Sequence, residues 1–365
     1  MSGNRQFWSG TAILAATTFL SYLLGFVRDR FFAQRFGASA TLDAYNAAFI
    51  VPDLLLNIFV AGALTAAFIP VFAQLLAGGQ RVEAERTANT VLTSALVGIA
   101  AIALVAAAIA PWLSRLVAPG FDAETRQLLT ALMRLMLISP IIFAASNTLG
   151  NILLQQHKFL FYGLSPALYN LGIISGTLFL APYWGIYGVV LGTIGGALLH
   201  LTLRIAGMRG SGIRYRPTLR LTAPVRAIAR LMLPKMAGHP VEQFTFFGFT
   251  AIASALGEGS IAILNFARNF QSVPVSVIGI AAGLALFPQL TAAAATKNAR
   301  EFRARLIDGL WMVLVLTALA AIVMYVLRTW LVGLLLGGGR FGNRDVALTA
   351  STLAVFTLSI PTESL

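Results

Sequence analysis

A group of charged residues lies at the end of one apolar stretch and within the next, where most charges are excluded. Its members are Arg28, Asp29, Arg30, Arg35, Asp43 and Asp53. A charged side chain in hydrocarbon costs about 2.5–3.5 kcal/mol on insertion scales, so its presence usually marks a functional group that faces an aqueous cavity. Guanidinium groups bind phosphate oxygens through paired hydrogen bonds. The sequence therefore predicts a site for a phosphorylated ligand at Arg28.

Arg28 has a second interpretation that needs no ligand. Its guanidinium would then form a structural ion pair with Asp29, Asp43 or Asp53. Arg30 would extend to the membrane interface, as long basic side chains near helix ends do. Both interpretations stay open at this point.

Asp43 and Asp53 are ten residues apart. Ten residues are close to three helical turns, so the two carboxylates would share one face of a continuous helix. Either one would suit a salt bridge to Arg28 or a proton-coupled gate. Asp43 also follows a turn, where a carboxylate commonly caps a helix. Arg28, Asp29, Asp43 and Asp53 are therefore candidate cavity residues.

Further polar residues inside the predicted spans extend the candidate site. Arg134 and Arg268 are intramembrane cations, and such groups usually face a cavity. Glu242 is a candidate for ion or proton coupling, or for an ion pair at the inner surface. Asn147 and Asn170 are predicted to form hydrogen bonds between helices.

The composition indicates a membrane protein, and the motifs give no sign of an enzyme. Of the 365 residues, 58% are hydrophobic and only 11% are charged, against roughly 25% charged in soluble domains. A polytopic membrane protein is predicted. Cysteine is absent and the three histidines lie far apart, so neither a disulfide nor a metal site is expected. No nucleophile–base set, phosphate-binding glycine–lysine loop or metalloprotease motif is present, so neither an enzyme nor a cofactor is expected.

The net charge of +13 is explained by the positive-inside rule rather than by nucleic-acid binding. Lys and Arg concentrate in alternate loops, above all in the loop after the sixth span, which includes Arg204, Arg209 and Arg214. This asymmetry predicts a cytoplasmic N-terminus. Residues 223–235 are predicted to belong to a plain linker, with an amphipathic helix on anionic lipid as the alternative.

The predicted fold is all-α, with about ten membrane spans. They lie near residues 10–33, 43–76, 88–113, 127–154, 160–181, 184–206, 226–255, 260–290, 305–336 and 345–365. Residues 1–208 would form a first lobe of six spans, 209–225 a basic cytoplasmic linker, and 226–365 a second lobe of about four. A faint repeat after Gly37 and Gly257 runs in the same direction in both copies, which predicts two parallel lobes.

Several short motifs follow one another along the chain. They include Leu23-Leu-Gly-Phe-Val-Arg28-Asp29, Leu42-Asp43-Ala-Tyr, Val51-Pro52-Asp-Leu-Leu and Ser165-Pro-Ala-Leu-Tyr-Asn170. These motifs resemble those of the MurJ/MviN lipid II flippase family, which belongs to the multidrug/oligosaccharidyl-lipid/polysaccharide exporter superfamily. The resemblance covers the whole chain in order.

The resemblance implies a multi-pass protein of the bacterial inner membrane that moves an undecaprenyl-pyrophosphate-linked peptidoglycan precursor outward. Alternating access around a cationic cavity is the implied mechanism. Membrane lipids and cell-wall synthesis proteins are the implied further partners. The family has more helices than the number predicted here, so the second lobe is expected to be incomplete.

The chain departs from the family pattern at positions that matter for the cavity. Asn57 lies where the family tends to have a basic residue, and Asn269 aligns best with a family arginine while Arg268 is its neighbour. One position is about 100° around a helix. Two other hypotheses therefore remain: a non-transporting membrane scaffold that binds lipid or proteins, and a cation-coupled exporter of drugs or polysaccharides.

Overall fold

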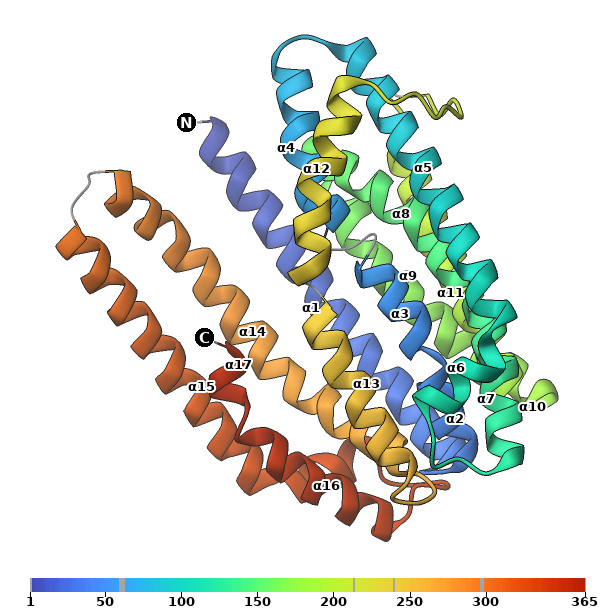
Figure 1. Ribbon diagram of the computed structural model, residues 1–365. Coiled ribbons are helices and arrows are strands. Elements are labelled where there is room, and N and C mark those ends of the chain that lie inside the picture. The colour runs from blue at the N-terminus through green and yellow to red at the C-terminus, as the bar shows by residue number, and fades with distance from the viewer. Residues whose placement is uncertain (1, 59–62, 213, 239, 296–298, 365) are drawn as a thin grey trace. The chain divides into compact units, whose positions relative to one another are not determined.

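The computed structural model describes residues 2–58, 63–212, 214–238, 240–295 and 299–364. Over these residues the chain is almost entirely helical, with one isolated β-bridge between Gly338 and Phe341 and no strand (Figure 1). The chain divides into two compact units. The first unit consists of Met1–Phe31 and Ala40–Glu258. The second unit consists of Phe32–Ser39 and Gly259–Leu365.

The first unit contains most of the helices, and α1 (Ser2–Phe36) contributes to both units. The others of the first unit are α2 (Ala40–Ala48), α3 (Ile50–Leu56), α4 (Ala63–Ala77), α5 (Arg81–Ala108), α6 (Ala110–Val117), α7 (Ala123–Met136), α8 (Ile138–Gln155), α9 (Phe159–Ser175), the π-helix η2 (Gly176–Leu180), α10 (Ala181–Trp184), α11 (Ile186–Gly207), α12 (Ala223–Gly238) and α13 (Pro240–Ser254). The second unit contains α14 (Ser260–Ala295), α15 (Ala299–Leu336), α16 (Asn343–Thr357) and α17 (Ile360–Ser364).

Six segments of the described residues are helical, long and apolar enough to cross a membrane. They are Ala12–Phe36, Arg81–Ala108, Ala123–Gln155, Phe159–Trp184, Ile186–Gly207 and Ala299–Leu336. Each overlaps a span that the sequence predicts. The total of about ten spans stays a prediction.

Local signals in the sequence define the ends of α5 and α7. Pro111 has no amide hydrogen, so it cannot bond to the carbonyl of Ala107 four residues earlier. At the junction with α6, Ile109 leaves the helical conformation, with φ −91° and ψ 9°. α7 begins after Asp122, whose carboxylate accepts a hydrogen bond from the backbone N–H of Thr125 at 2.7 Å. That bond lowers the pKa of Asp122.

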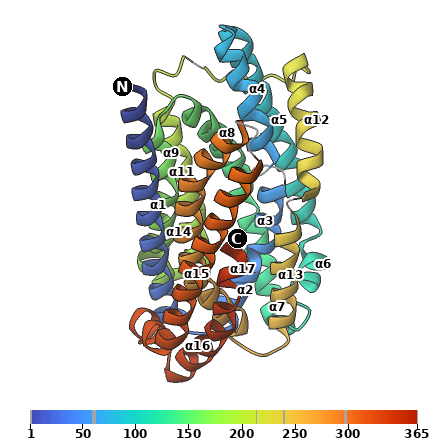
Figure 2. The same cartoon turned by 90° about the vertical axis from the view of Figure 1, so that its left-hand side faces the viewer.

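Glycine residues allow α9 and η2 to pack on α11 with backbone against backbone. Figure 2 shows α9 and α11 beside each other. A Cβ atom at Gly172 would collide with the Cα of Gly196. One at Gly192 would lie 2.5 Å from the Cα of Gly176. Such spacing of small residues is the usual way for membrane helices to approach closely. This contact fixes the two helices that carry much of the polar cluster described below.

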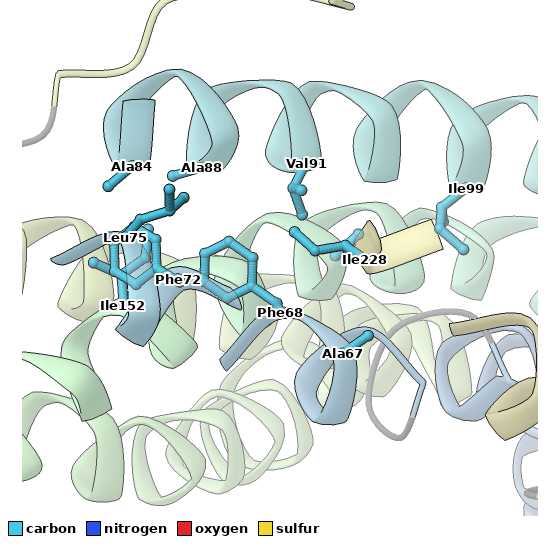
Figure 3. Close-up of a cluster of buried hydrophobic side chains, with 11 residues drawn as sticks. Ala67, Phe68, Phe72, Leu75, Ala84, Ala88, Val91, Ile99, Ile152 and Ile228 are labelled. Carbon is cyan, nitrogen blue, oxygen red and sulfur yellow. The ribbon is translucent and has the colours of Figure 1, made fainter. Parts of the chain in front are cut away.

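A buried apolar cluster joins α4, α5, α8 and α12 (Figure 3). Phe68 and Phe72 of α4 stack at its centre, with ring centroids 4.9 Å apart. Val91 of α5 and Ile228 of α12 pack in the same cluster. The prediction that residues 223–235 belong to a plain linker is therefore wrong, because the apolar face of this segment is buried against other helices.

Gly192→Leu is expected to force α9 and α11 apart. Overpacking typically costs about 1–3 kcal/mol, and here the obstacle is the Gly176 backbone rather than a movable side chain. The purified variant in detergent should unfold at a lower temperature than the unmodified protein. Gly195→Leu on the same helix is the matched control, because a Cβ there meets nothing within 4 Å. Equal unfolding temperatures for both variants would contradict the close packing.

Candidate functional site

Arg28 is oriented by two partners from two helices of the first unit. Its Nε and Nη2 atoms donate to Asp29 Oδ1 at 3.0 and 2.8 Å, and its Nη1 donates to Asn170 Oδ1 of α9 at 3.1 Å. The Asp29 side chain is 5% exposed, whereas that of Arg28 is 23% exposed. The ion pair with Asp29 is thus present, and the Arg28 side chain is partly exposed.

Asn170 joins α9 to α1 at this position. Its Nδ2 atom donates to the backbone oxygen and the hydroxyl of Ser21, at 3.2 and 3.3 Å. Because Nδ2 donates to α1 and Oδ1 accepts from Arg28, both halves of the amide are engaged. The prediction that Asn170 forms hydrogen bonds between helices is confirmed.

Two tyrosines lie within electrostatic range of Arg28, namely Tyr45 on α2 and Tyr169 on α9. Asp53 of α3 lies near both of them. The Tyr45 hydroxyl lies 2.9 Å from Thr193 Oγ1 of α11. Since the Thr193 hydroxyl donates to a carbonyl of its own helix, Tyr45 donates to Thr193. Residues from α1, α2, α3 and α9 therefore gather in one region of the first unit.

Three further candidates, on α2, on α3 and just after α3, differ in how much of the residue is exposed. Asp43 is 1% exposed, Asp53 is exposed, and Asn57 is half-buried immediately after α3. Each carboxylate lies in the first turn of its own helix, where the helix dipole favours negative charge. Asp43 belongs to α2 and Asp53 to α3, and only Phe49 separates these two helices. The expectation that both carboxylates share one helical face stays a prediction.

Arg134 of α7 has a contact that explains it structurally. It is exposed, and its Nε donates to the carbonyl of Ala107 on α5 at 3.1 Å. That carbonyl is the one that Pro111 cannot satisfy. Arg134 therefore completes the hydrogen bonding of α5 at its broken end, and this described contact does not involve Arg28.

The last three candidates lie elsewhere in the chain. Arg268 and Asn269 are half-buried neighbours on α14 of the second unit. The backbone oxygen of Asn269 accepts a hydrogen bond from the hydroxyl of Ser272 at 2.8 Å. Glu242 belongs to α13, but its side chain is outside the described part of the chain.

A second arginine site was missed by the sequence analysis, which assigned Arg204 to a basic loop. Arg204 lies in α11 and is only 3% exposed. Its Nη1 donates to the Ser146 carbonyl and to Asn147 Oδ1, both at 2.8 Å, and its Nε donates to Ser165 Oγ at 3.3 Å. Its guanidinium carbon is 4.8 Å from the ring centroid of Tyr162. These partners join α8, α9 and α11 through neutral groups.

His200, one turn before Arg204 on α11, extends this second site. Its Nδ1 lies 2.7 Å from Ser146 Oγ, and its ring makes an edge contact with Phe143, which also contacts Tyr169. These ring contacts connect the second site to the surroundings of Arg28. The spacing of His200 and Arg204 by four residues inside an apolar span was the signal for this site, because such residues share a helix face.

Comparisons with known proteins identify relatives along nearly the whole chain. A family model described as lipid II flippase MurJ matches residues 32–365. The lipid II flippase MurJ of Burkholderia cenocepacia is 28% identical, over 94% of this chain and 68% of that protein. The probable lipid II flippase MurJ of Bdellovibrio bacteriovorus is 30% identical, over 95% of this chain and 68% of that protein.

Solved structures show the same fold. A lipid II flippase MurJ in an inward closed conformation matches with a TM-score of 0.82 and 24% identity, covering 97% of this chain and 73% of that one. An inward-facing multidrug resistance MATE family transporter of the MOP superfamily matches with a TM-score of 0.73 and 16% identity, covering 94% and 79%. The prediction of an all-α membrane transporter fold is confirmed.

Arg204→Leu is expected to destabilise the first unit, because Ser146, Asn147 and Ser165 would each lose a donor. One buried polar group without a partner costs about 1–3 kcal/mol. The variant should unfold at a lower temperature in detergent than the unmodified protein. Arg204→Lys should unfold at an intermediate temperature, because an ammonium group lacks the planar set of N–H donors of a guanidinium. Arg209→Ala, at an exposed arginine just beyond α11, is the control. Unchanged unfolding of Arg204→Leu would contradict a stabilising role for Arg204.

Proposed function

Because the chain belongs to the lipid II flippase MurJ family, we propose that it transports a lipid-linked saccharide of the lipid II type and that Arg28 binds the phosphates of the headgroup. The observation that carries this proposal is the state of the Arg28 side chain. Three of its hydrogen bonds orient it on Asp29 and Asn170, and it is still 23% exposed.

The chemistry of the guanidinium explains how such a headgroup would be held. Arginine has five N–H donors in a rigid plane, and Asp29 and Asn170 fix the orientation of that plane. Phosphate oxygens would bind to the same guanidinium. Hydrogen bonds between ionised partners are roughly twice as strong as neutral ones. Asp29 compensates the charge of Arg28 when no substrate is bound. An anionic headgroup would add a second negative partner on binding, while Asp29 stays paired.

The proposed transport cycle exposes this site alternately to the two sides of the membrane. Residues 1–208 would form the first lobe, 209–225 the basic linker and 226–365 the second lobe. The candidate cavity residues remain Asp43, Asp53, Asn57, Arg268 and Asn269. Glu242 remains a candidate for ion coupling. Arg134 also stays a candidate cavity residue because of its positive charge, although its described contact, with the Ala107 carbonyl, is structural.

The proposed location is the bacterial inner membrane, with the N-terminus in the cytoplasm. Exposed arginines follow α11 in the segment that includes Arg214, Arg216 and Arg220, and such clusters favour the cytoplasmic side. The proposed substrate carrier is undecaprenyl pyrophosphate. Proteins of cell-wall synthesis are the proposed protein partners.

Arg28→Ala is expected to abolish rescue of bacterial cells depleted of their own lipid II flippase, whereas the unmodified protein should restore growth. Hydrogen bonds to charged groups contribute about 1.5–3 kcal/mol, so transport should slow by roughly 10- to 100-fold. Arg28→Lys should rescue weakly, because lysine keeps the charge but loses the paired geometry.

Arg30→Ala is the matched control, since Arg30 is an exposed arginine two residues along the same helix. All variants must be shown to reach the membrane at equal levels. Failure of the unmodified protein to rescue while it is present in the membrane would reject transport and favour a lipid- or protein-binding scaffold. Full rescue by Arg28→Ala would reject the assigned role of Arg28.

A further inference from the structure

A groove with a volume of about 290 Å³ runs between α5 and α12 in the first unit. Its walls include Val91, Gly98 and Ile102 of α5 and Ile228 and Met232 of α12. The α12 residues recur at helical spacing and form a stripe along one face. Both helices run side by side in the two ribbon views (Figures 1 and 2).

The groove is apolar, has a packed floor and is open along one side. Val91 and Ile228 belong to the buried cluster of Figure 3 and form its floor. Gly98 is exposed, and a Cβ atom there would meet nothing within 4 Å. On the same helix and the same face, Val105 is 60% exposed. This exposed apolar surface continues from the groove, as expected of a surface in contact with lipid chains.

A basic segment is fixed over one end of the groove. Asn89 Nδ2 donates to the Arg214 carbonyl at 2.9 Å, and the Arg214 N–H donates to Glu85 Oε1 at 3.0 Å. The hydroxyls of Tyr215 and Thr93 lie 3.2 Å apart. Residues 214–222 are thereby held on the first turns of α5 before they lead into α12.

The charges at this end are mostly positive. Five exposed arginines lie on the segment and on α12, namely Arg214, Arg216, Arg220, Arg226 and Arg230. The carboxylates on the adjoining turns of α5 are Glu83 and Glu85. Glu83 is within 4.0 Å of Arg86, and Glu85 accepts from the segment backbone. The excess of positive charge is therefore available to an anionic headgroup.

We propose that the groove binds one acyl chain of an anionic phospholipid, whose headgroup meets the arginines of residues 214–230. From Val91 to Ile102 the groove extends roughly 17 Å along α5, at 1.5 Å per residue. That length matches one leaflet of a hydrocarbon core that is about 30 Å thick. A single phospholipid chain occupies such a depth, whereas a long polyprenyl tail would exceed it. The bound lipid would anchor α12 to α5.

This proposal is independent of flippase activity, so lipid binding is the readout. The complete chain is purified in detergent, and its binding of phosphatidylglycerol is measured by native mass spectrometry during a titration. Gly98→Leu places a side chain in the groove, and the apparent affinity should fall about tenfold, the effect expected of overfilling a packed site. Leucine favours a helix over glycine, so thermal unfolding should show no loss of stability.

Two comparisons make the result specific. Gly195→Leu also fills open space, but on α11, and should bind phosphatidylglycerol like the unmodified protein. Arg216→Ser with Arg220→Ser should reduce the preference for phosphatidylglycerol over zwitterionic phosphatidylethanolamine by roughly fivefold per arginine.

Three outcomes would overturn the proposal. The first is wild-type phosphatidylglycerol affinity in Gly98→Leu. The second is an unchanged lipid preference in the double arginine variant. The third is a loss in Gly98→Leu that affects undecaprenyl phosphate but leaves phosphatidylglycerol binding intact, which would assign the groove to the carrier lipid instead.

Discussion

The absence of water from the hydrocarbon core requires each buried polar group to find its partner inside the protein. This requirement determines which helices meet. The carbonyl of Ala107, left open by Pro111, receives a hydrogen bond from Arg134, which ties α7 to α5. The hydroxyl of Tyr45 finds Thr193 and ties α2 to α11. Polar contacts thus give specific pairings to helices whose apolar surfaces alone would pack in many ways.

Arg28 and Arg204 meet this requirement in opposite ways. Arg28 has a carboxylate partner and partial exposure, so its charge is compensated and the side chain can also meet an anion from outside. Arg204 is surrounded by carbonyl, amide, hydroxyl and ring groups and is almost completely buried. Breaking its contacts would leave dipoles and a guanidinium unsatisfied together. The first arrangement suits binding and release, whereas the second suits a permanent connection between helices.

The sequence predicted the fold class, and it offered Asp29 as one of three possible partners of Arg28, because a charge inside an apolar run is visible without knowing the fold. It also predicted the bridging role of Asn170. The sequence did not predict the buried site of Arg204. A positive residue near the end of a span looks the same in the sequence whether its side chain extends to the membrane interface or packs between helices. The sequence also missed the division between α2 and α3, because a periodic pattern assumes an unbroken helix.

The glycine contact between α9 and α11 has a consequence for how such a protein changes shape. Where backbone touches backbone, no side chain can change its rotamer to absorb a displacement. A slide of one residue would bring a larger neighbour of Gly172 or Gly192 against the opposite helix. The two helices must therefore translate and tilt as one rigid body in any conformational cycle. The deformation has to occur at interfaces lined by long, repackable side chains, or at helix breaks such as the one before Pro111.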